Sequence, residues 1–442
     1  WEKKQISKYN ELTMNKTINI AVVGLGQIGS YLYNELNLKK KDIFNKTGKK
    51  INVVAISAKN KNKKRKFKIN KKIFYSDPLK ILKSKNIDIL FELIGFSDGI
   101  SKKIVEKSLK NKIHVITPNK ALIAKHGDYL SKLAEKNKVN LEFEASVGGG
   151  IPILRTIKEG LATNKISKVY GILNGTSNYI LSEMETTKNN FSDVLKKAQM
   201  LGYAEPGNPK FDLNGYDALA KVKILSSLSF NNKISNSKYL MEGIQNIEYK
   251  DIEIVDQLNY RIKLLGITEI IDKKLFERVH PCLVKKNTYI GNVNGVMNAV
   301  ILEGMPVGES VLQGEGAGSG PTSSALMSDL LSILRGNIKY PFGISDLKRK
   351  KVKIYDINKY RNALYIRLEV KDKPGVLSVI TRQLAKYNIS VKRLIQIPDH
   401  KKKTASIAII THEANELNSK KCLKSFKVNN NVIKPPVLIR LF

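Results

Sequence analysis

Three glycines near the amino end of the chain have the spacing of a phosphate-binding turn. They lie in the run Gly24-Leu25-Gly26-Gln27-Ile28-Gly29, which is G-x-G-x-x-G. In such a turn the first glycine allows a tight reversal, the second admits a pyrophosphate, and the third lets helix and strand pack closely. The following helix adds backbone N–H groups and a positive dipole end. We predict that this run binds a dinucleotide; the alternative is a glycine-rich turn without a ligand.

The segment after the second predicted strand bears on which dinucleotide binds. Sites that prefer NAD place an Asp or Glu there for the ribose 2′-OH, but no acidic residue occurs between Asp42 and Asp77. The strand instead ends near Ser57 and Lys59, and further basic residues follow: Lys61, Lys63, Lys64 and Arg65. A cationic loop with a hydroxyl suits a 2′-phosphate. We therefore expect Ser57 and Lys59 to bind NADP, with NAD possible; because lysine is abundant throughout, a solvated loop is the alternative.

Asp217 and Lys221 are candidates for proton transfer. They are four residues apart on a predicted helix, so they share a face. An exposed pair of this kind contributes little to stability. The surrounding helix is mostly apolar, however, and a charged pair buried there is costly unless it has a function. If a bound dinucleotide reduces a carbonyl, the alkoxide formed needs a proton. None of the five histidines lies in a motif-like cluster, so a lysine ammonium is the natural donor.

The elements that position these residues begin with an alternation of strands and helices. Apolar runs cover residues 18–24, 51–56, 87–94 and 113–116, and helical patterns lie between them. Such alternation gives a parallel sheet with right-handed crossovers. We predict an α/β chain whose N-terminal domain, residues 15–143, is a Rossmann doubly wound parallel sheet, preceded by an N-terminal extension at residues 1–14.

The rest of the chain divides into two further predicted domains. Glycine clusters and long helical patterns indicate an α+β substrate and dimerisation domain over residues 144–345, and a basic stretch indicates a linker over 346–361. Residues 362–442 have the order β-α-β-β-α-β of a ferredoxin-like unit. Its expected elements are residues 363–370, 375–388, 389–397, 404–411, 416–426 and 432–441.

Composition restricts the partners and the compartment. The net charge is +38, but the excess is mostly lysine scattered along the whole chain, whereas base-reading proteins tend to concentrate arginine on one element. We therefore expect no nucleic-acid partner. Two distant cysteines, Cys282 and Cys422, are typical of a reducing compartment. The sequence contains neither a signal-like apolar segment nor a membrane-spanning run, so we expect a cytoplasmic protein without a membrane partner.

Several segments, taken in order, resemble homoserine dehydrogenases. They are ITPNKA at 116–121, EASVGGGIP at 144–152, NGTSNYIL at 174–181, GYAEP at 202–206, DLNGYD at 212–217 leading to Lys221, and GEGAG at 314–318 with Pro321 and Thr322. The resemblance covers residues 17–335. It departs from the family pattern between Glu205 and Asp217, where the loop is one residue longer and lacks an aspartate.

The resemblance implies the interconversion of L-aspartate 4-semialdehyde and L-homoserine in threonine, methionine and isoleucine biosynthesis. It implies that Lys221 is the acid/base and that Asp217 orients it. Lys120 would face the substrate and the nicotinamide. Glu205, with Gly202 nearby, would bind the α-ammonium group of the substrate.

Two further sites follow from the same resemblance. Gly318 would contact the cofactor. A monovalent cation would be bound by one carboxylate and several backbone carbonyls, from Glu144, Val147, Gly149 and Ile151. These hard oxygen ligands suit Na⁺; the alternative is a glycine-rich turn between domains.

The C-terminal segment is similar to an ACT domain, notably in RLEV at 367–370, DKPGVL at 372–377 and NIS at 388–390. Gly375 would open a helix whose backbone N–H groups accept an amino-acid carboxylate. We expect feedback control, with threonine as the effector, and a homodimer or homotetramer. The alternative is an interaction domain that has lost its ligand.

Two other functions compete with this one. A hydroxy-acid dehydrogenase with a C-terminal ACT domain would need a histidine acid/base and a nucleotide domain inserted in mid-chain, whereas the glycine run here is N-terminal. A cofactor-binding regulatory protein would need a helix-turn-helix or a similar reader, and we find no such pattern.

Overall fold

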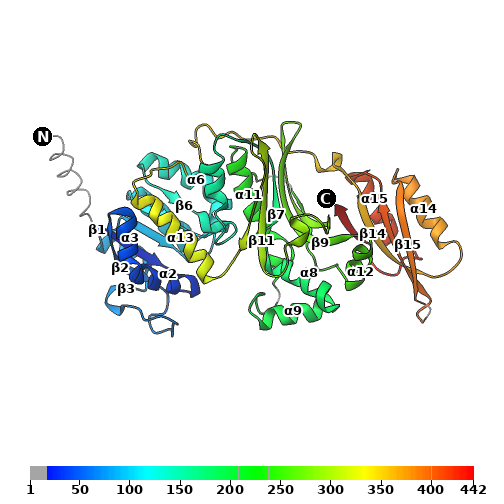
Figure 1. Cartoon of the computed structure of the whole chain (residues 1–442), viewed down its shortest axis with the longest axis horizontal. Helices are drawn as coiled ribbons and strands as arrows, with labels where there is room; N and C mark the ends of the chain where they lie inside the picture. The colour runs from blue at the N-terminus through cyan, green and yellow to red at the C-terminus, as the bar shows by residue number, and fades with distance from the viewer. Residues whose placement is uncertain (1–16, 208, 237–238, 400) are drawn as a thin grey trace. The chain divides into compact units, whose positions relative to one another are not determined.

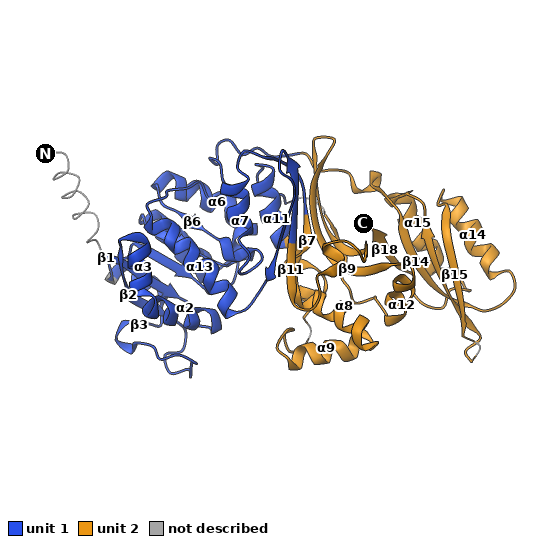
Figure 2. Ribbon diagram, viewed as in Figure 1, with its two compact units in different colours: residues 1–169, 220–236, 300–352 blue, residues 170–219, 237–299, 353–442 orange. Residues whose placement is uncertain are grey.

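The computed structural model describes residues 17–207, 209–236, 239–399 and 401–442. The predicted N-terminal extension, residues 1–14, lies outside the described residues. The chain forms two compact units, coloured separately in Figure 2. Unit 1 comprises residues 1–169, 220–236 and 300–352, and unit 2 comprises residues 170–219, 237–299 and 353–442.

Unit 1 contains a six-stranded parallel sheet with the order β3-β2-β1-β4-β5-β6. Its strands are β1 (Thr17–Val23), β2 (Lys50–Ser57), β3 (Phe74–Tyr75), β4 (Ile89–Glu92), β5 (His114–Ile116) and β6 (Leu141–Glu142). The connecting helices are α2 (Gln27–Leu38), α3 (Lys40–Thr47), α4 (Pro78–Ser84), α5 (Ile100–Lys110) and α6 (Lys120–Asn137) (Figure 1). The predicted Rossmann-like arrangement is confirmed.

The register of this sheet brings three strand ends level with one another. Val23 of β1 pairs with Ser57 of β2 and with Glu92 of β4. The segments that follow these strands therefore leave the sheet at the same edge, where ligands bind in open α/β sheets. The glycine run starts at this edge with Gly24.

A helix from much later in the chain completes the core of unit 1. In α13 (Ser319–Leu334), Leu326 and Leu330 are fully buried in the same apolar cluster as Ile20 and Leu32. The nucleotide-binding sheet is thus covered partly by residues far outside the predicted first domain. Unit 1 also holds α7 (Ile153–Arg155), a π-helical turn (Thr156–Gly160) and β12 (Gly308–Glu315), and three elements, β7 (Lys165–Ile172), α11 (Tyr216–Ser229) and β11 (Met297–Met305), contribute residues to both units.

Unit 2 begins with helices packed against a long hairpin. The hairpin consists of β9 (Tyr260–Ile271) and β10 (Lys274–Lys285), which pair antiparallel along their whole length. The short strand β8 (Leu240–Met241) pairs with β10. The helices are α8 (Gly175–Thr187), α9 (Phe191–Met200), α10 (Lys210–Leu213) and α12 (Tyr249–Gln257). None of the helices described in either unit combines the length and apolar character that a bilayer crossing requires.

The last part of unit 2 has the predicted β-α-β-β-α-β order. It consists of β14 (Leu364–Lys371), α14 (Val376–Lys386), β15 (Val391–Asp399), β16 (Thr404–Thr411), α15 (Glu416–Lys427) and β18 (Val437–Leu441). The strand order is β18-β14-β16-β15 and every pairing is antiparallel. The outer strand β18 also pairs parallel with β10, so the C-terminal sheet continues into the sheet of the hairpin.

Candidate active site

The three glycines of the first turn meet different surroundings. A Cβ atom on Gly24 would lie 2.5 Å from the carbonyl oxygen of Leu93, and one on Gly29 would lie 1.8 Å from the carbonyl oxygen of Gly24. A Cβ atom on Gly26 would have no neighbour within 4 Å. Gly24 and Gly29 are therefore required by packing, whereas Gly26 faces open space beside the first turn of α2. This division matches the three roles expected of a dinucleotide turn.

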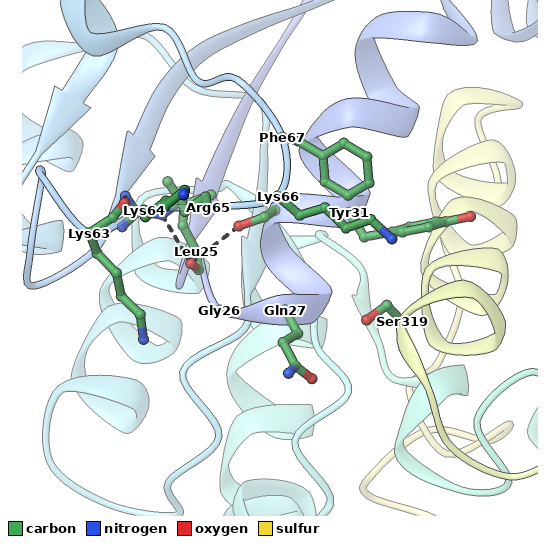
Figure 3. Close-up of a pocket in the computed structure, with 11 residues that line it drawn as sticks. Leu25, Gly26, Gln27, Tyr31, Lys63, Lys64, Arg65, Lys66, Phe67 and Ser319 are labelled. Atoms are coloured by element: carbon green, nitrogen blue, oxygen red, sulfur yellow. Dashed lines mark hydrogen bonds between the residues drawn. The ribbon is translucent and has the colours of Figure 1, made fainter. Parts of the chain in front are cut away.

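A cavity of about 540 Å³ opens beside this turn in unit 1 (Figure 3). It is lined by the turn, by the basic loop after β2 and by one residue of α13. These residues are Leu25, Gly26, Gln27, Ser30, Tyr31, Lys63, Lys64, Arg65, Lys66, Phe67 and Ser319. The rings of Tyr31 and Phe67 meet edge to face with their centroids 5.8 Å apart, and in Figure 3 Lys63 lies on the opposite side of the cavity.

Arg65 holds the basic loop in place. Its Nε donates to the carbonyl oxygen of Leu25 in the glycine turn (3.2 Å), and its Nη atoms donate to the carbonyl oxygens of Lys63 (2.9 Å) and Asn60 (2.8 Å). The guanidinium therefore joins the basic loop to the glycine turn through backbone acceptors. It keeps its positive charge, and the neighbouring lysines that line the cavity add to it.

The predicted cofactor residues lie around this turn. Gly26 and Gln27 line the cavity, and Ile28 follows in the first turn of α2. Ser57 is buried, and its carbonyl oxygen accepts a hydrogen bond from the backbone N–H of Gly24 (2.8 Å). Lys59 is exposed but does not line the cavity.

One predicted residue, Gly318, flanks the cavity, and three residues that line it were not predicted. Gly318 is the N-cap of α13, next to the lining residue Ser319. Sequence reasoning missed Tyr31, Phe67 and Ser319. Tyr31 stands one helical turn after Gln27 on α2, a spacing that could have suggested it. Ser319 comes from α13 and directly follows the predicted Gly318, a neighbour that could have suggested it.

Lys120 is the first residue of α6 and is half-buried. The helix is capped by Asn119, whose Oδ1 accepts a hydrogen bond from the backbone N–H of Leu122 (3.0 Å). This cap begins directly after β5, at the same sheet edge as the glycine turn. The position agrees with that of active-site residues in open α/β sheets.

Several residues of the predicted substrate site come together at the start of α8 in unit 2. Asn174 caps this helix through its Oδ1, and its Nδ2 donates to Oδ2 of Asp217 (2.9 Å) and Oδ1 of Asp212 (2.8 Å). The hydroxyl of Thr176 donates to the carbonyl oxygen of Tyr203 (2.6 Å). This bond ties the start of α8 to the turn that contains Gly202 and the exposed Glu205.

The predicted pair on α11 is buried. Asp217 is 5% exposed and Lys221 is 7% exposed, and Ala218, Leu219 and Val222 around them are buried too. The apolar surroundings expected from the sequence are therefore present. Burying two charged side chains one turn apart on an apolar helix is costly in stability, which favours a role in function.

Comparisons with family models and with known proteins point to one family. Residues 24–144 match the model "Homoserine dehydrogenase, NAD binding domain", residues 152–331 the model "Homoserine dehydrogenase", and residues 364–427 the model "ACT domain". The homoserine dehydrogenase of Neisseria gonorrhoeae is 38% identical over 432 residues, covering 96% of this chain and 99% of that protein. This chain belongs to the homoserine dehydrogenase family.

Two further homoserine dehydrogenases match this chain over nearly its whole length. The enzyme of Helicobacter pylori is 37% identical over 97% of this chain and 100% of its own. The crystal structure of a homoserine dehydrogenase from Thiobacillus denitrificans superposes with a TM-score of 0.87 at 35% identity, covering 97% of this chain and 99% of that one. The chain is therefore an NAD(P)-dependent oxidoreductase of amino-acid biosynthesis, and these matches decide against the hydroxy-acid dehydrogenase and the regulatory protein.

The residues predicted to hold a cation already take part in other hydrogen bonds. The Glu144 carboxylate, whose pKa is raised by burial, accepts hydrogen bonds from the backbone N–H groups of Leu154 (2.9 Å) and Arg155 (2.8 Å). The carbonyl oxygen of Ile151 accepts one from the backbone N–H of Ile153 (2.8 Å). The Glu144 carboxylate thus caps α7, and a cation here would depend largely on the carbonyl oxygens of Val147 and Gly149.

The ACT domain has a cavity of about 280 Å³ where its first strand meets its first helix. Pro374, Gly375 and Val376 line it, together with Gln396 of β15 and Ile407 of β16. Gly375 has a φ of +86° and is the N-cap of α14, without a side-chain cap. The first N–H groups of α14 therefore lie at the predicted effector site.

Proposed function

We propose that this chain interconverts L-aspartate 4-semialdehyde and L-homoserine with Lys221 as the acid/base and Asp217 as its orienting partner. The observation that carries the proposal is the burial of both residues one turn apart on α11. A hydrogen bond from Asn174 fixes the Asp217 carboxylate on its far side. A charged pair held in this way is positioned to move one proton.

The roles of the side chains follow from the balance of the reaction. When bound, the reduced nicotinamide supplies a hydride to the aldehyde carbon. The carbonyl oxygen then becomes an alkoxide, and the Lys221 ammonium donates the proton that converts it to the hydroxyl of homoserine. In the reverse direction, neutral Lys221 removes that proton. Lys120 would contact the substrate and the nicotinamide from the sheet edge.

Glu205 would bind the α-ammonium group of the substrate, with Gly202 shaping the turn. This part is supported by the exposure of Glu205 and by the Thr176–Tyr203 hydrogen bond, which holds the turn against α8. A carboxylate on an exposed turn can bind a cationic group without the desolvation penalty of a buried charge. Glu205→Gln should therefore raise KM for the amino-acid substrate more than it lowers kcat.

The acid/base role is tested by Lys221→Ala. We expect kcat to fall by about 10²- to 10⁴-fold, the usual contribution of a general acid or base. Lys223→Ala is the matched control because Lys223 lies on the same helix outside the proposed site. Both variants are to be compared by NADPH consumption and by thermal unfolding. Near-normal turnover of a folded Lys221→Ala enzyme would reject the mechanism.

We propose further that NADP is the preferred cofactor. The support is the cavity beside Gly26, where Lys63 and Lys64 provide positive charge for a 2′-phosphate. We expect a higher kcat/KM with NADPH than with NADH, and Lys63→Ala with Lys64→Ala should reduce the ratio of the two values. A clear preference of the unmodified enzyme for NADH would contradict the proposal.

The ACT domain would bind threonine as a feedback inhibitor. Its cavity at Gly375 lies at the N-terminus of α14, which has no side-chain cap, and the backbone N–H groups of a helix N-terminus suit an amino-acid carboxylate. L-threonine should lower activity and raise the unfolding temperature, since a ligand of the folded state stabilises it, and D-threonine is the control. The absence of both effects would reject threonine. The predicted homodimer or homotetramer can be tested by sedimentation with and without the amino acid.

A Na⁺ ion near Val147 and Gly149 would complete the proposed enzyme. Backbone carbonyl oxygens are suitable ligands for it, and its role would be to fix the segment that follows β6. Among the described residues no three His, Cys, Asp or Glu side chains form a metal-binding group. Anomalous scattering after soaking a crystal in a heavier monovalent ion would locate the cation; no peak at these carbonyls would count against it.

A further inference from the structure

Glu92, the last residue of β4, is a fully buried carboxylate that binds two loops at once. Its Oε1 accepts hydrogen bonds from the backbone N–H groups of Ile94 (2.9 Å) and Gly95 (3.3 Å) and from the hydroxyl of Ser101. Its Oε2 faces the segment after β5. A carboxylate in the protein interior is costly unless it is satisfied in this way, and bonds to a charged acceptor are strong.

On the Oε2 side, Glu92 holds the turn that leads into Lys120. The hydroxyl of Thr117 donates to Oε2 (2.7 Å) and accepts from the backbone N–H of Asn119 (3.0 Å). The side-chain amide of Asn119 donates to the same Oε2 (3.3 Å) while its Oδ1 caps α6. Both residues that flank Pro118 are thus attached to one carboxylate, and Lys120 follows immediately.

On the Oε1 side, Glu92 holds the loop that packs on the glycine turn. The backbone N–H of Leu93 donates to the carbonyl oxygen of Val23 (2.7 Å), and the carbonyl oxygen of Leu93 leaves no room for a Cβ atom on Gly24. Asn119 also reaches this loop, donating to the carbonyl oxygen of Phe96 (2.9 Å). The two loops are therefore joined both through Glu92 and directly.

We propose that Glu92 is a positioning residue for the reaction: its carboxylate fixes Lys120 relative to the dinucleotide turn. The inference rests on the proposed role of Lys120. The five hydrogen bonds described for the Glu92 carboxylate all come from donors, so an amide at this position would offer N–H groups where acceptors are needed. Small displacements of a positioned catalytic group lower the rate of the chemical step more than they weaken binding.

The first test compares Glu92→Gln with Asp88→Asn. Asp88 lies just before the other end of β4 and accepts a hydrogen bond from the backbone N–H of Asn19 (2.8 Å), so it controls for loss of a carboxylate from the same strand. We expect Glu92→Gln to lower kcat by about 10- to 100-fold with a smaller change in KM for the cofactor, and Asp88→Asn to leave both unchanged. An unchanged kcat in folded Glu92→Gln would overturn the proposal.

Thr117 provides a second pair of variants in case Glu92→Gln folds poorly. Thr117→Val removes the hydroxyl that joins Glu92 to Asn119, whereas Thr117→Ser retains it. The valine variant should show the same loss of kcat and the serine variant should restore turnover. Equal activities of these two variants would overturn the proposal.

A double-mutant cycle with Lys120→Ala separates this inference from the function on which it rests. Single-turnover rates are measured with enzyme in excess, so that low activities remain measurable. If Glu92 acts through Lys120, Glu92→Gln should cost much less in the Lys120→Ala background than in the unmodified enzyme. Equal losses in both backgrounds would overturn the positioning role alone. Full activity of Lys120→Ala would instead overturn the role of Lys120, and with it the coupling.

Discussion

Gly26 and Gly29 of the dinucleotide-binding turn differ in the space available for a methyl group. In Gly29→Ala the new Cβ atom would lie 1.8 Å from the Gly24 carbonyl oxygen, so α2 and the turn could not keep their packing. In Gly26→Ala it would project into the open space where the cofactor should pass. We expect the first variant to unfold at a much lower temperature. The second should keep the unfolding temperature and raise KM for the cofactor by about tenfold or more.

Thermal unfolding and cofactor titration distinguish these outcomes. Gly29→Ala with an unchanged unfolding temperature would contradict the observed packing. Unchanged cofactor binding by Gly26→Ala would contradict the site assignment.

Lys263 of β9 is a buried cation with neutral partners. Its ammonium donates to the carbonyl oxygen of Val293 (2.6 Å) and to the side-chain oxygens of Asn178 (3.2 Å) and Asn294 (3.0 Å). Burial lowers the pKa of Lys263 to about 8. Asn178 of α8 donates to the same loop, including the carbonyl oxygen of Val293 (3.1 Å). Lys263 thus stabilises the loop after β10, while the desolvation of its charge lowers the free energy of unfolding.

This arrangement predicts a dependence of stability on pH. The pKa of Lys263 is about 8 in the folded state and about 10.4 in the unfolded state. Between these values the unfolded chain binds more protons, so the contribution of Lys263 to the free energy of unfolding rises with pH. The unmodified enzyme should gain stability relative to Lys263→Met from pH 8 to about pH 10. Lys285→Met, at an exposed lysine of β10, is the control, and a constant difference across this range would refute the prediction.

At the scale of elements, Asp251 joins α12 to the ACT strand β14. Its carboxylate accepts hydrogen bonds from Nε (2.6 Å) and Nη2 (3.1 Å) of Arg367 and from the hydroxyl of Tyr365 (2.9 Å). It also accepts one from the backbone N–H of Glu248 at the start of α12 (2.9 Å). The two side chains that meet at Asp251 are buried, and the backbone N–H comes from the N-cap of α12, so α12 cannot shift without breaking this cluster.

Removing the charge of Asp251 should therefore be costly. Asp251→Asn leaves Arg367 buried with a weaker partner, and we expect a loss of about 3 kcal/mol in the free energy of unfolding. Lys434→Ala breaks an ion pair with Glu248 that is exposed on both sides and should cost less than about 1 kcal/mol. Chemical denaturation measures both variants. Similar losses in the two would show that burial of the Asp251 cluster contributes little.

The elements that could be predicted from the sequence are those with a local periodicity. The strands β1, β2, β4 and β5 of the nucleotide-binding sheet and the six ACT elements lie close to their predicted positions. The strands β3 and β6, of two residues each, were not predicted. The last strand is shorter than expected, beginning at Val437 rather than at 432, because Pro435 and Pro436 lack the N–H groups that a ladder requires. The helix α3 and the π-helical turn at 156–160 have no strong periodic signal and were not predicted.

The parts of the site formed by neighbouring residues in the sequence could be predicted, whereas the parts formed by contacts between distant residues could not. The glycine turn and the Asp217–Lys221 spacing are visible in a few consecutive residues. Ser319 and the buried face of α13 depend on contacts with residues almost at the other end of the chain. Glu92 was missed because a single glutamate ending an apolar run has no spacing partner. Only the fold shows that its five donors come from two loops and a helix.

At the scale of the whole molecule, the pairing of β18 with β10 joins the ACT domain to the preceding part of unit 2. Cys282 and Leu283 of β10 pair with Arg440 and Leu441 of β18. The Arg440 side chain is buried and binds the carboxylates of Glu416 (2.7 Å) and Glu242 (2.7 Å). The ACT domain therefore completes a sheet that begins in the preceding part of unit 2.

A chain truncated after residue 361 should for this reason be prone to aggregation. It would lack β18 and expose the backbone of β10 around the apolar residues Cys282 and Leu283, and such an edge invites pairing with other chains. We expect this truncated protein to aggregate, as measured by size-exclusion chromatography and light scattering. Gln396→Ala, which alters only the effector cavity, should remain dispersed. A truncated chain that is monodisperse and fully active would refute the prediction.

That shared strand has a practical consequence for anyone seeking an enzyme insensitive to its end product. Deleting or exchanging the ACT domain would remove a structural neighbour along with the proposed effector site. Desensitised forms are better sought by single substitutions around the mouth of the effector cavity, and a transplanted sensor would have to bring a final strand whose register matches that of the native one.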